Sequence, residues 1–412
     1  MRPSKITTEK ITILYATMAR IPGERAHSIQ IARMCSALQE MGSNVILISP
    51  KRGDKFTRKA KMRDVIKYYG LKTPFTHFKV PVIGLFNENV KIENLSWFIA
   101  AWTLTSFTLA LYMALKLFLR KNVYIYVREP LLYIMLTISS WLLKPKIIYE
   151  IHELPAFLKD GPRLFWSLME QTHLIICIAQ ALSNVVISRL KKGKERVFTL
   201  HDAVDDEIFN VEDTCPEDLV SIKKMYRIIM YTGHLDRWKR PEYLIDMMKH
   251  IAENDVALVF VGGSKEDILR LKQYAESNGL GEKVFFLGWR QPSQVPKYIA
   301  FADVLVHYSP APRGRPQSPL KIFEYMLSGK PIAAPKAPGI DEVLHDGVNA
   351  LLFDLSDPAD AAEKITLLLK DKELGKILAT NARNAALSKY TYKVRARTLL
   401  ELLNNISIQE RY

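Results

Sequence analysis

Basic residues gather at the start of a predicted helix, in the stretch SPLKIFEYMLSGKPIAAP that begins at Ser318. Ser318 suits the N-cap, and Pro319 suits the first position of the helix. Lys321 then falls in the first turn, where the helix dipole disfavours a cation. Arg313 and Arg315 add positive charge in the loop just before it. This pattern indicates that an anion binds here, and the amides of the first turn favour a phosphate group.

A second basic cluster follows a predicted strand, in the segment YTGHLDRWKRPEY. Its glycine permits close approach of the backbone to a ligand, and its cations could face a diphosphate. A solvated basic loop is the alternative explanation of the same spacing. The residues concerned are Gly233, His234, Arg237, Lys239 and Arg240.

Glu324 lies three residues after Lys321, so the two side chains share one face of the predicted helix. An acidic residue near a phosphate site commonly binds ribose hydroxyls. An isolated glutamate at this position would more often be a solvated surface residue. The neighbouring cations favour a nucleotide site.

The first half of the chain offers polar residues where two predicted strands end. His152 ends the strand KIIYEIH and stands beside Glu153, and Arg128 and Glu129 follow the strand VYIYV. A purely structural histidine is the alternative for His152. The sequence has no GxGxxG after its first strand, no P-loop, and no His, Cys or Asp cluster with metal-site spacing. These absences weaken a nicotinamide, flavin or metal-centre interpretation.

The composition narrows the class of partner. A chain of 412 residues is long for a single core, so two domains are expected. The net charge of +15 points to nucleic acid, a nucleotide or an anionic membrane, although a basic surface also serves solubility. The cysteines Cys35, Cys177 and Cys215 are too far apart for a disulfide framework or a zinc site, which favours a reducing cytoplasm. The amino terminus lacks the apolar core of a signal peptide, so secretion is not expected.

Short β-branched runs alternate with helical segments in both halves, which predicts an α/β fold with parallel, doubly wound sheets. A loop, TMARIPGERAHS, leads to a helix from about Ile29 to Met41. The polar stretch from Asp205 to Ser221 is the best candidate for a linker. Ligands of such sheets bind outside the carboxyl ends of the strands. The predicted strands are 11–16, 44–49, 123–127, 146–152, 174–179, 196–201, 227–233, 256–263, 284–289 and 304–309.

These segments, taken in order, resemble the retaining glycosyltransferases of family 4. The resemblance is carried by RIPGERAHSIQIARMCSAL, YVREP, YEIHELP, HDAVDDEIF, YTGHLDRWKRPEYLI, VFFLGW and SPLKIFEYMLSGKPIAAP, with EVLHDGVNALLF behind them, and it covers nearly the whole chain. It implies the GT-B fold, in which two Rossmann-like domains face a cleft. Residues 1–205 would bind the acceptor and residues 206–390 the nucleotide sugar. A helix in 391–412 would pack back towards the amino-terminal domain.

The resemblance also assigns roles to residues. It implies catalytic roles for His152, Lys239 and Glu324, with His152 at the donor sugar and Glu324 at the ribose. The loop from Pro22 to Ser28 would close over the cleft. The diphosphate would be held by Gly233, His234, Arg237, Lys239, Ser318, Pro319, Leu320 and Lys321, the base by Gly288, Trp289 and Arg290, and the acceptor loop would contribute Gly23, Arg25, His27 and Ser28.

Two positions depart from the family pattern. Pro316 stands eight residues before Glu324, where the family has an acidic residue that touches the transferred sugar. His234 stands where the family often has arginine, so its phosphate contact could pass to Arg237 or Lys239. The first departure leaves the sugar open, and the arginines before Pro316 suggest a carboxylate-bearing sugar such as a uronic acid.

The implied reaction is transfer of a hexosyl group with retention from a nucleotide sugar, most simply UDP- or GDP-linked, to a glycan or lipid-linked acceptor. Cations and helix amides would stabilise the leaving diphosphate without a metal or a separate cofactor. One rival is a nucleotide-sugar epimerase of the same fold. Another is a non-catalytic basic protein that binds a membrane or nucleic acid; for the enzyme itself no nucleic-acid partner is expected.

The run from Asn94 to Leu115 carries no charge and is long enough, as a helix, to cross a bilayer. Crossing would put flanking strands of one α/β unit on opposite sides, so a spanning segment contradicts the predicted fold. It is either a core helix or a helix dipping into the lipid surface. Flanking Trp and basic residues, with the net charge, favour peripheral association with an anionic membrane on its cytoplasmic face. Those flanking residues are Trp97, Trp102, Lys116, Arg120 and Lys121.

Overall fold

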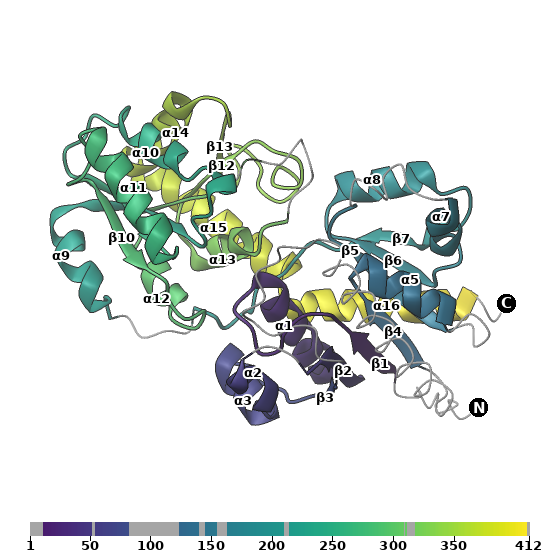
Figure 1. Ribbon diagram of the computed structural model, residues 1–412. Coiled ribbons are helices and arrows are strands. Elements are labelled where there is room, and N and C mark those ends of the chain that lie inside the picture. Colours follow the sequence, from purple (N-terminus) through teal and green to yellow (C-terminus); the bar gives the residue numbers. More distant parts are fainter. Residues whose placement is uncertain are drawn as a thin grey trace, which may run out of the picture. The chain divides into compact units, whose positions relative to one another are not determined.

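The computed structural model of the 412-residue chain describes residues 11–51, 54–81, 123–139, 145–154, 163–209, 214–308, 310 and 318–409. The chain divides into two compact units, each built on one parallel sheet (Figure 1). Unit 1 comprises Met1–Ile178, Leu182–Leu200 and Arg395–Tyr412, and unit 2 comprises Ala179–Ala181 and His201–Val394. The predicted α/β class with two doubly wound parallel sheets is confirmed.

Unit 1 contains a seven-stranded sheet in the order β3-β2-β1-β4-β5-β6-β7, and its paired strands are parallel. The order reverses between β1 and β4, which is where doubly wound sheets bind their ligands. The strands are β1 Thr12–Ala16, β2 Asn44–Pro50, β3 Thr76–Val80, β4 Val123–Val127, β5 Lys146–Ile151, β6 Leu174–Cys177 and β7 Val197–Thr199. The helices are α1 Ala26–Glu40, α2 Lys55–Lys59, α3 Met62–Tyr69, α5 Pro130–Ser139, α7 Arg163–Met169, most of α8 Gln180–Arg189 and most of α16 Tyr392–Gln409, with the 3-10 turn η2 Lys194–Arg196.

Unit 2 contains a six-stranded parallel sheet in the order β10-β9-β8-β11-β12-β13. The order reverses between β8 and β11, so the corresponding ligand position lies beside these two strand ends. The strands are β8 Arg227–Thr232, β9 Val256–Val261, β10 Val284–Gly288, β11 Val304–Val306, β12 Ile332–Pro335 and β13 Leu351–Phe353. The helices are α9 Glu217–Met225, α10 Glu242–Met248, α11 Lys265–Ser277, α12 Val295–Ile299, α13 Leu320–Ser328, α14 Pro358–Lys370 and α15 Lys372–Lys389, with the 3-10 turn η3 Arg237–Lys239.

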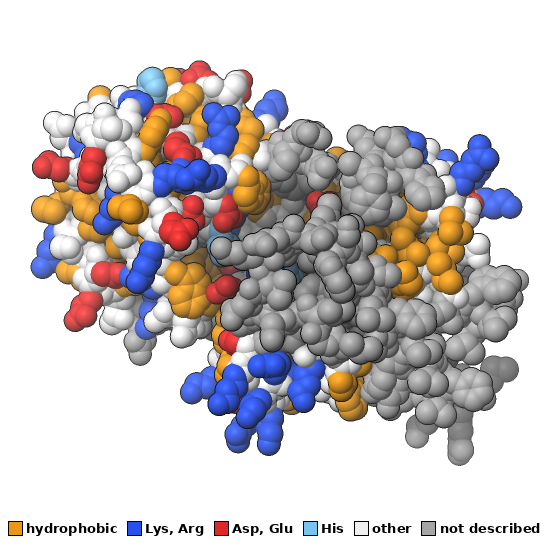
Figure 2. All heavy atoms as spheres, viewed as in Figure 1, with side chains coloured by type: hydrophobic (Ala, Val, Ile, Leu, Met, Phe, Trp, Pro, Cys, Tyr) orange, Lys and Arg blue, Asp and Glu red, His pale blue; other side chains and the backbone are white. Residues whose placement is uncertain are grey.

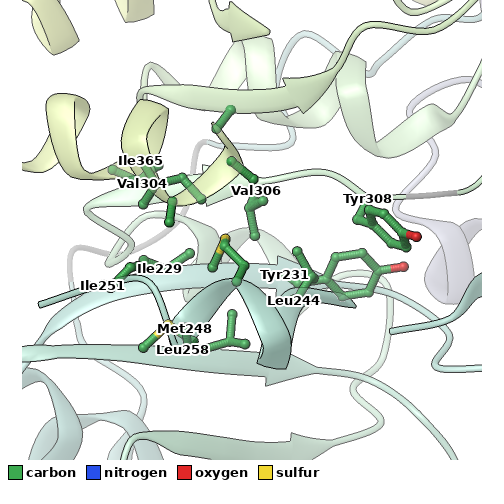
Figure 3. Packing of buried hydrophobic residues seen from close by; sticks show 14 of the residues in the cluster. Ile229, Tyr231, Leu244, Met248, Ile251, Leu258, Val304, Val306, Tyr308 and Ile365 are labelled. Atoms are coloured by element: carbon green, nitrogen blue, oxygen red, sulfur yellow. The ribbon is translucent and has the colours of Figure 1, made fainter. Parts of the chain in front are cut away.

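The core of unit 2 fixes the ends of its central strands. Every residue of β9 is buried because this central strand is covered on both faces. Figure 3 shows Ile229 and Tyr231 of β8 and Val304 and Val306 of β11 facing side chains from α10 and α14. Tyr308 stacks on Tyr243 of α10 with ring centroids 4.1 Å apart. This contact anchors the segment just after β11 to α10.

Two local predictions need correction. The helix expected from about Ile29 begins at Ala26 after the extended residue Arg25, so His27 and Ser28 lie in its first turn rather than in a loop. Ala26 is a strong helix former, and no Gly or Pro interrupts the segment after it. The predicted linker 205–221 likewise overlaps α9, which begins at Glu217 after the N-cap residue Pro216. Glu217 and Asp218 lie in its first turn, where the helix dipole favours acidic residues.

Candidate functional site

The carboxyl end of β8 lies close to the start of α13. Gly233 follows β8 with a φ of +126°, and a Cβ added to it would lie 2.8 Å from Nζ of Lys321. Gly262 follows β9 with a φ of +131°, and its added Cβ would meet the carbonyl oxygen of Gly233 at 2.2 Å. Only glycine fits such backbone angles and such close contacts. The side of Gly233 where a Cβ would stand, which the sequence suggested for a ligand, thus faces the amino group of Lys321.

The helix start differs by one residue from the prediction. Pro319, with φ −72° and ψ 123°, is the N-cap of α13, and the helix begins at Leu320. Ser318 does not cap it, because its hydroxyl oxygen accepts a hydrogen bond from the backbone N–H of Asp202 at 3.2 Å. Proline fits the cap because its fixed φ also suits extended backbone. Lys321 is consequently the second residue of the helix, nearer the positive end of the dipole than predicted.

Lys321 makes one contact that favours a cation, but its burial disfavours the charged form. Its Nζ lies 3.9 Å from the centroid of the Tyr231 ring, a cation–π contact. Burial lowers the pKa of Lys321 to about 7, although Glu324 one turn later opposes that shift. Near neutral pH the Lys321 amine is therefore only partly protonated. An anion bound beside it would raise its pKa and restore the full positive charge.

Lys239 joins Lys321 near the same strand end. It closes η3, and its Nζ lies 3.5 Å from a carboxylate oxygen of Asp236. Burial and the charge of Lys321 lower the pKa of Lys239, and Tyr231 and Asp236 counteract only part of this. Because the two lysines repel each other, an anion bound between them would be stabilised by both.

A third member of this cluster, His307, was not recognised in the sequence. It follows β11, its side chain is 1% exposed, and neither ring nitrogen has a hydrogen-bond partner among the described residues. Burial, then Lys321 and Lys239, hold the pKa of His307 well below its ordinary value, so the imidazole is neutral. Buried polar groups are nearly always paired. The signal was present in VLVHYS, where a histidine directly follows a buried strand.

The other residues of unit 2 that were predicted to bind the nucleotide sugar differ in exposure and in their bonds. Glu324 is partly buried on α13, whereas His234 and Arg237 are exposed. Trp289, after β10, is 48% exposed. Arg290 hydrogen-bonds to Asp218 and to the hydroxyl of Tyr298, so its guanidinium is already held by α9 and α12.

In unit 1 the predicted His152 follows β5, and its Nε2 lies 2.5 Å from Oε1 of the buried Glu150. One oxygen of Glu129 accepts from the hydroxyl of Thr17 at 2.6 Å and from the N–H of Met18 at 3.0 Å. These bonds tie the segment after β1 to the end of β4. Glu150 was not singled out in the sequence, although its spacing of two from His152 along a strand puts both on one face.

The segment around Gly23 is anchored within unit 1. The hydroxyl of Tyr69 donates to the carbonyl of Gly23 at 2.8 Å and accepts from its N–H at 2.6 Å. The hydroxyl of Thr57 donates to the carbonyl of Pro22 at 3.2 Å. Ser28 is buried in α1. The segment is therefore held by α2 and α3.

Several predicted features lie outside the described residues: Arg313, Arg315, Pro316 and the apolar run 94–115 with its flanks. Within the part of the chain that the structure describes, no three His, Cys, Asp or Glu side chains are grouped so as to hold a metal ion.

Solved structures share this architecture. HepE from Anabaena, crystallised in complex with UDP, matches with a TM-score of 0.72 over 96% of this chain and 100% of that one, at 20% identity. Two Rossmann-like units of seven and six parallel strands, matched at this level, define the GT-B fold class.

The family follows from the second unit. The family model "Glycosyl transferases group 1" matches residues 219–385, the segment that holds Lys239, Lys321 and Glu324. This match covers most of unit 2 and confirms the resemblance to group 1 glycosyltransferases that the sequence indicates.

Curated relatives agree with this assignment. An uncharacterised glycosyltransferase of Methanocaldococcus jannaschii is 25% identical over 231 residues, 55% of this chain and 57% of that protein. The N-acetyl-alpha-D-glucosaminyl L-malate synthase of Bacillus anthracis is 23% identical over 229 residues, 54% of this chain and 57% of that enzyme. The matches thus span little more than half the length of either relative.

Proposed function

We propose that this protein is a retaining glycosyltransferase that moves a hexosyl group from a nucleoside diphosphate sugar to a glycan or lipid-linked acceptor. One observation carries the proposal: burial lowers the pKa values of Lys321 and Lys239 at the end of β8, and the nearby carboxylates of Glu324 and Asp236 offset only part of this. Neither ring nitrogen of the neighbouring His307 has a hydrogen-bond partner among the described residues. A diphosphate supplies the missing charge. The match of this segment to glycosyl transferases group 1 supports the same class.

The cations act mainly on the leaving group. Breaking a sugar–phosphate bond places negative charge on the departing diphosphate, and preorganised cations with the amides at the start of α13 stabilise that charge. Lys321 gains a proton as the diphosphate binds, because an adjacent anion raises a lysine pKa. The neutral His307 can donate one N–H to a phosphate oxygen. In this scheme the leaving phosphate assists deprotonation of the acceptor, and neither a protein nucleophile nor a metal is needed.

Three further roles complete the proposal. Glu324 binds the ribose hydroxyls, one helical turn beyond the phosphate-binding residue Lys321. Trp289 stacks on the base, with the backbone at Gly288 and Arg290. His152 acts on the donor sugar near the reacting carbon. UDP is the first nucleotide to test, since the fold neighbour HepE was crystallised with it, and GDP is the second.

Peripheral association with an anionic membrane at its cytoplasmic face is also proposed. Seven exposed basic residues lie within 51–67, on and around α2 and α3. Figure 2 shows Lys and Arg side chains gathered over this part of unit 1. Each could add about 1 kcal/mol of attraction to anionic lipid. No helix in the described ranges is both long and apolar enough to cross a membrane. The seven basic residues are Lys51, Lys55, Arg58, Lys59, Lys61, Arg63 and Lys67.

A two-stage experiment tests the activity. Thermal shift with UDP, GDP and ADP identifies the base, since a ligand that binds the native state raises its melting temperature. The protein is then incubated with sugars linked to that nucleotide. Slow release of nucleoside diphosphate supports a transferase, and isomerisation of the sugar would make it an epimerase. If no nucleotide binds and no sugar nucleotide changes, the proposal is wrong and a non-catalytic basic protein remains.

A further inference from the structure

A buried carboxylate lies behind the predicted sugar-contacting histidine of unit 1. Glu150 is the fifth residue of β5, its side chain is 1% exposed, and His152 follows two positions later on the same face. We propose that Glu150, kept ionised by Arg395 of α16, is a positioning residue that holds His152 with its proton on Nε2 and presents Nδ1 to the substrate. The catalytic consequence rests on the proposed function, whereas the tautomer of His152 does not.

The two oxygens of Glu150 are fully used. Oε1 lies 2.5 Å from Nε2 of His152 and accepts a longer contact of 3.5 Å from the amide of Gln30. Oε2 accepts from the hydroxyl of Tyr126 and, at 3.1 Å, from Nη2 of Arg395. These partners come from α1, β4, the end of β5 and α16. The carboxylate therefore has one fixed orientation, and so does the imidazole bonded to it.

Arg395 supplies the charge that makes this arrangement possible. Its side chain is 3% exposed, and Nη2 also donates to the carbonyl of Leu200 at 3.0 Å. Burial by itself would raise the pKa of Glu150, but Arg395, then His152 and Arg128, hold it well below its ordinary value. Glu150 is consequently an anion at neutral pH despite its burial.

The protonation of Glu150 decides the tautomer of His152. An ionised carboxylate can only accept hydrogen bonds, so the proton between the two groups must belong to Nε2. Nδ1 has no hydrogen-bond partner among the described residues, and the imidazole is 19% exposed. One ring nitrogen is thus used for orientation and the other remains for a ligand. A carboxylate that fixes a catalytic imidazole in this way is the logic of the serine-protease triad.

The other titratable groups around Glu150 do not compete for this role near neutral pH. Burial is the first cause that raises the pKa of each neighbouring phenol and thiol, and the charge of Glu150 adds to it. These groups stay protonated, while Arg128 is bonded to Gln30 and stays charged. The groups that face Glu150 are Tyr15 of β1, Tyr126 of β4, Arg128 after β4, His152 after β5, Cys177 of β6 and Arg395 of α16.

The tautomer can be measured without any substrate. In protein labelled with ¹⁵N-histidine, the His152 signals are identified by their loss in His152→Ala. We expect the Nε2–H form in the wild type and in Tyr126→Phe, which removes a different bond to the same carboxylate. We expect Glu150→Gln to give a mixture of tautomers, since an amide can donate or accept. A wild-type imidazole protonated only at Nδ1 would overturn the inference whether or not the protein is a glycosyltransferase.

Glu150→Gln leaves Arg395 buried without its counter-charge and could prevent folding. The double variant Glu150→Gln with Arg395→Gln removes both charges together, which buried ion pairs generally tolerate better. Folding of each variant is checked by circular dichroism. UDP affinity reports separately on unit 2, where the proposed UDP site lies. A folded double variant that keeps the single wild-type tautomer would also refute the proposed role of Glu150.

Turnover then tests whether Glu150 acts through His152. Once donor use is established, the folded charge-neutral variant should lower kcat roughly 10- to 100-fold, the range seen when partners of metal-bound histidines are removed, with little change in donor KM. In a His152→Ala background the same change should cause no further loss. Equal losses in both backgrounds would make Glu150 merely structural. Absence of donor turnover in the wild type would count against the proposed function while leaving the tautomer result valid.

Discussion

Replacing Lys321 by methionine separates a binding role from a structural one. Methionine keeps the length and apolar stem of the side chain but removes its charge. If Lys321 is held for an anion, the variant should lose nucleotide affinity and gain stability, because a poorly solvated cation disappears. If Lys321 instead stabilises the start of α13, the variant should lose stability.

The size of the expected stability gain follows from the pKa shift of Lys321. Burial lowers the pKa of Lys321 from 10.5 to about 7, and each unit corresponds to about 1.36 kcal/mol. The full shift is therefore on the order of 4–5 kcal/mol. Because the side chain is only partly buried and solvent screens the interaction, we expect roughly 2 kcal/mol.

The pH dependence has a definite sign. The folded-state pKa of Lys321 lies below its unfolded value, so between pH 7 and 10.5 the unfolded chain binds more protons and stability rises with pH. Below pH 7 the whole cost of the charge is present. Lys321→Met should remove this rise, and melting temperatures measured from pH 6 to 10 test it. Lys265→Met is a matched control, since Lys265 also lies in the first turn of a helix but is exposed.

Binding of a diphosphate should make Lys321 take up a proton, whereas folding makes it lose one. A bound diphosphate raises the pKa of Lys321, so UDP binding near pH 8 should take up close to one proton more in the wild type than in Lys321→Met. Calorimetry in two buffers of different ionisation enthalpy measures this difference and cancels the titration of UDP itself. A Lys321→Met protein that is less stable than the wild type and binds UDP equally well would refute the reasoning.

Three further predictions concern the remaining residues. Lys239→Ala and Glu324→Ala should each weaken use of sub-saturating donor by about 1.5–3 kcal/mol, the value of one charge-assisted contact, without unfolding; unchanged turnover in both would exclude this donor site. His152→Ala should lower turnover roughly a hundredfold at nearly constant nucleotide affinity, and a parallel loss of affinity would make His152 structural. Anionic liposomes should carry the protein upward on flotation at low salt but not at high salt; changing the basic residues of α2 and α3 to serine should abolish this, and an unbound wild type would defeat the membrane proposal.

Much of the fold could be read from hydrophobic pattern. Strands buried on both faces, such as VALVFV at 256–261, form continuous apolar runs that few other elements imitate. The strands that were missed lack this signal. β3, THFKV, is an edge strand with alternating exposed residues, and β12 and β13 contain only four and three residues. Pairing with neighbouring strands of the folded sheet, rather than their own composition, makes them strands.

The candidate site was predictable where chemistry leaves a local pattern. A lysine in the first turn of a helix contradicts the dipole, and that contradiction led to Lys321. His307 and Glu150 carry no such contradiction, since a single polar residue in or after an apolar run is compatible with many structures. What distinguishes them is their partners: two lysines distant in sequence for His307, and an arginine 245 residues away for Glu150. Such contacts exist only in the folded chain.

The two strand-end sites balance their charges in opposite ways. In unit 1 the charge of Glu150 is neutralised internally by Arg395 and its hydrogen bonds are complete, so His152 is oriented before any ligand arrives. In unit 2 Asp236 and Glu324 offset only part of the cost of burying Lys239 and Lys321, so the pKa values of both lysines fall. In the proposed function a bound diphosphate completes this site. Orientation before binding suits the role proposed for His152 at the donor sugar, because correct placement is what such a residue contributes. A site whose lysines are only partly compensated suits the proposed leaving diphosphate, because the bound anion raises the pKa of Lys321 and restores its positive charge beside the leaving group.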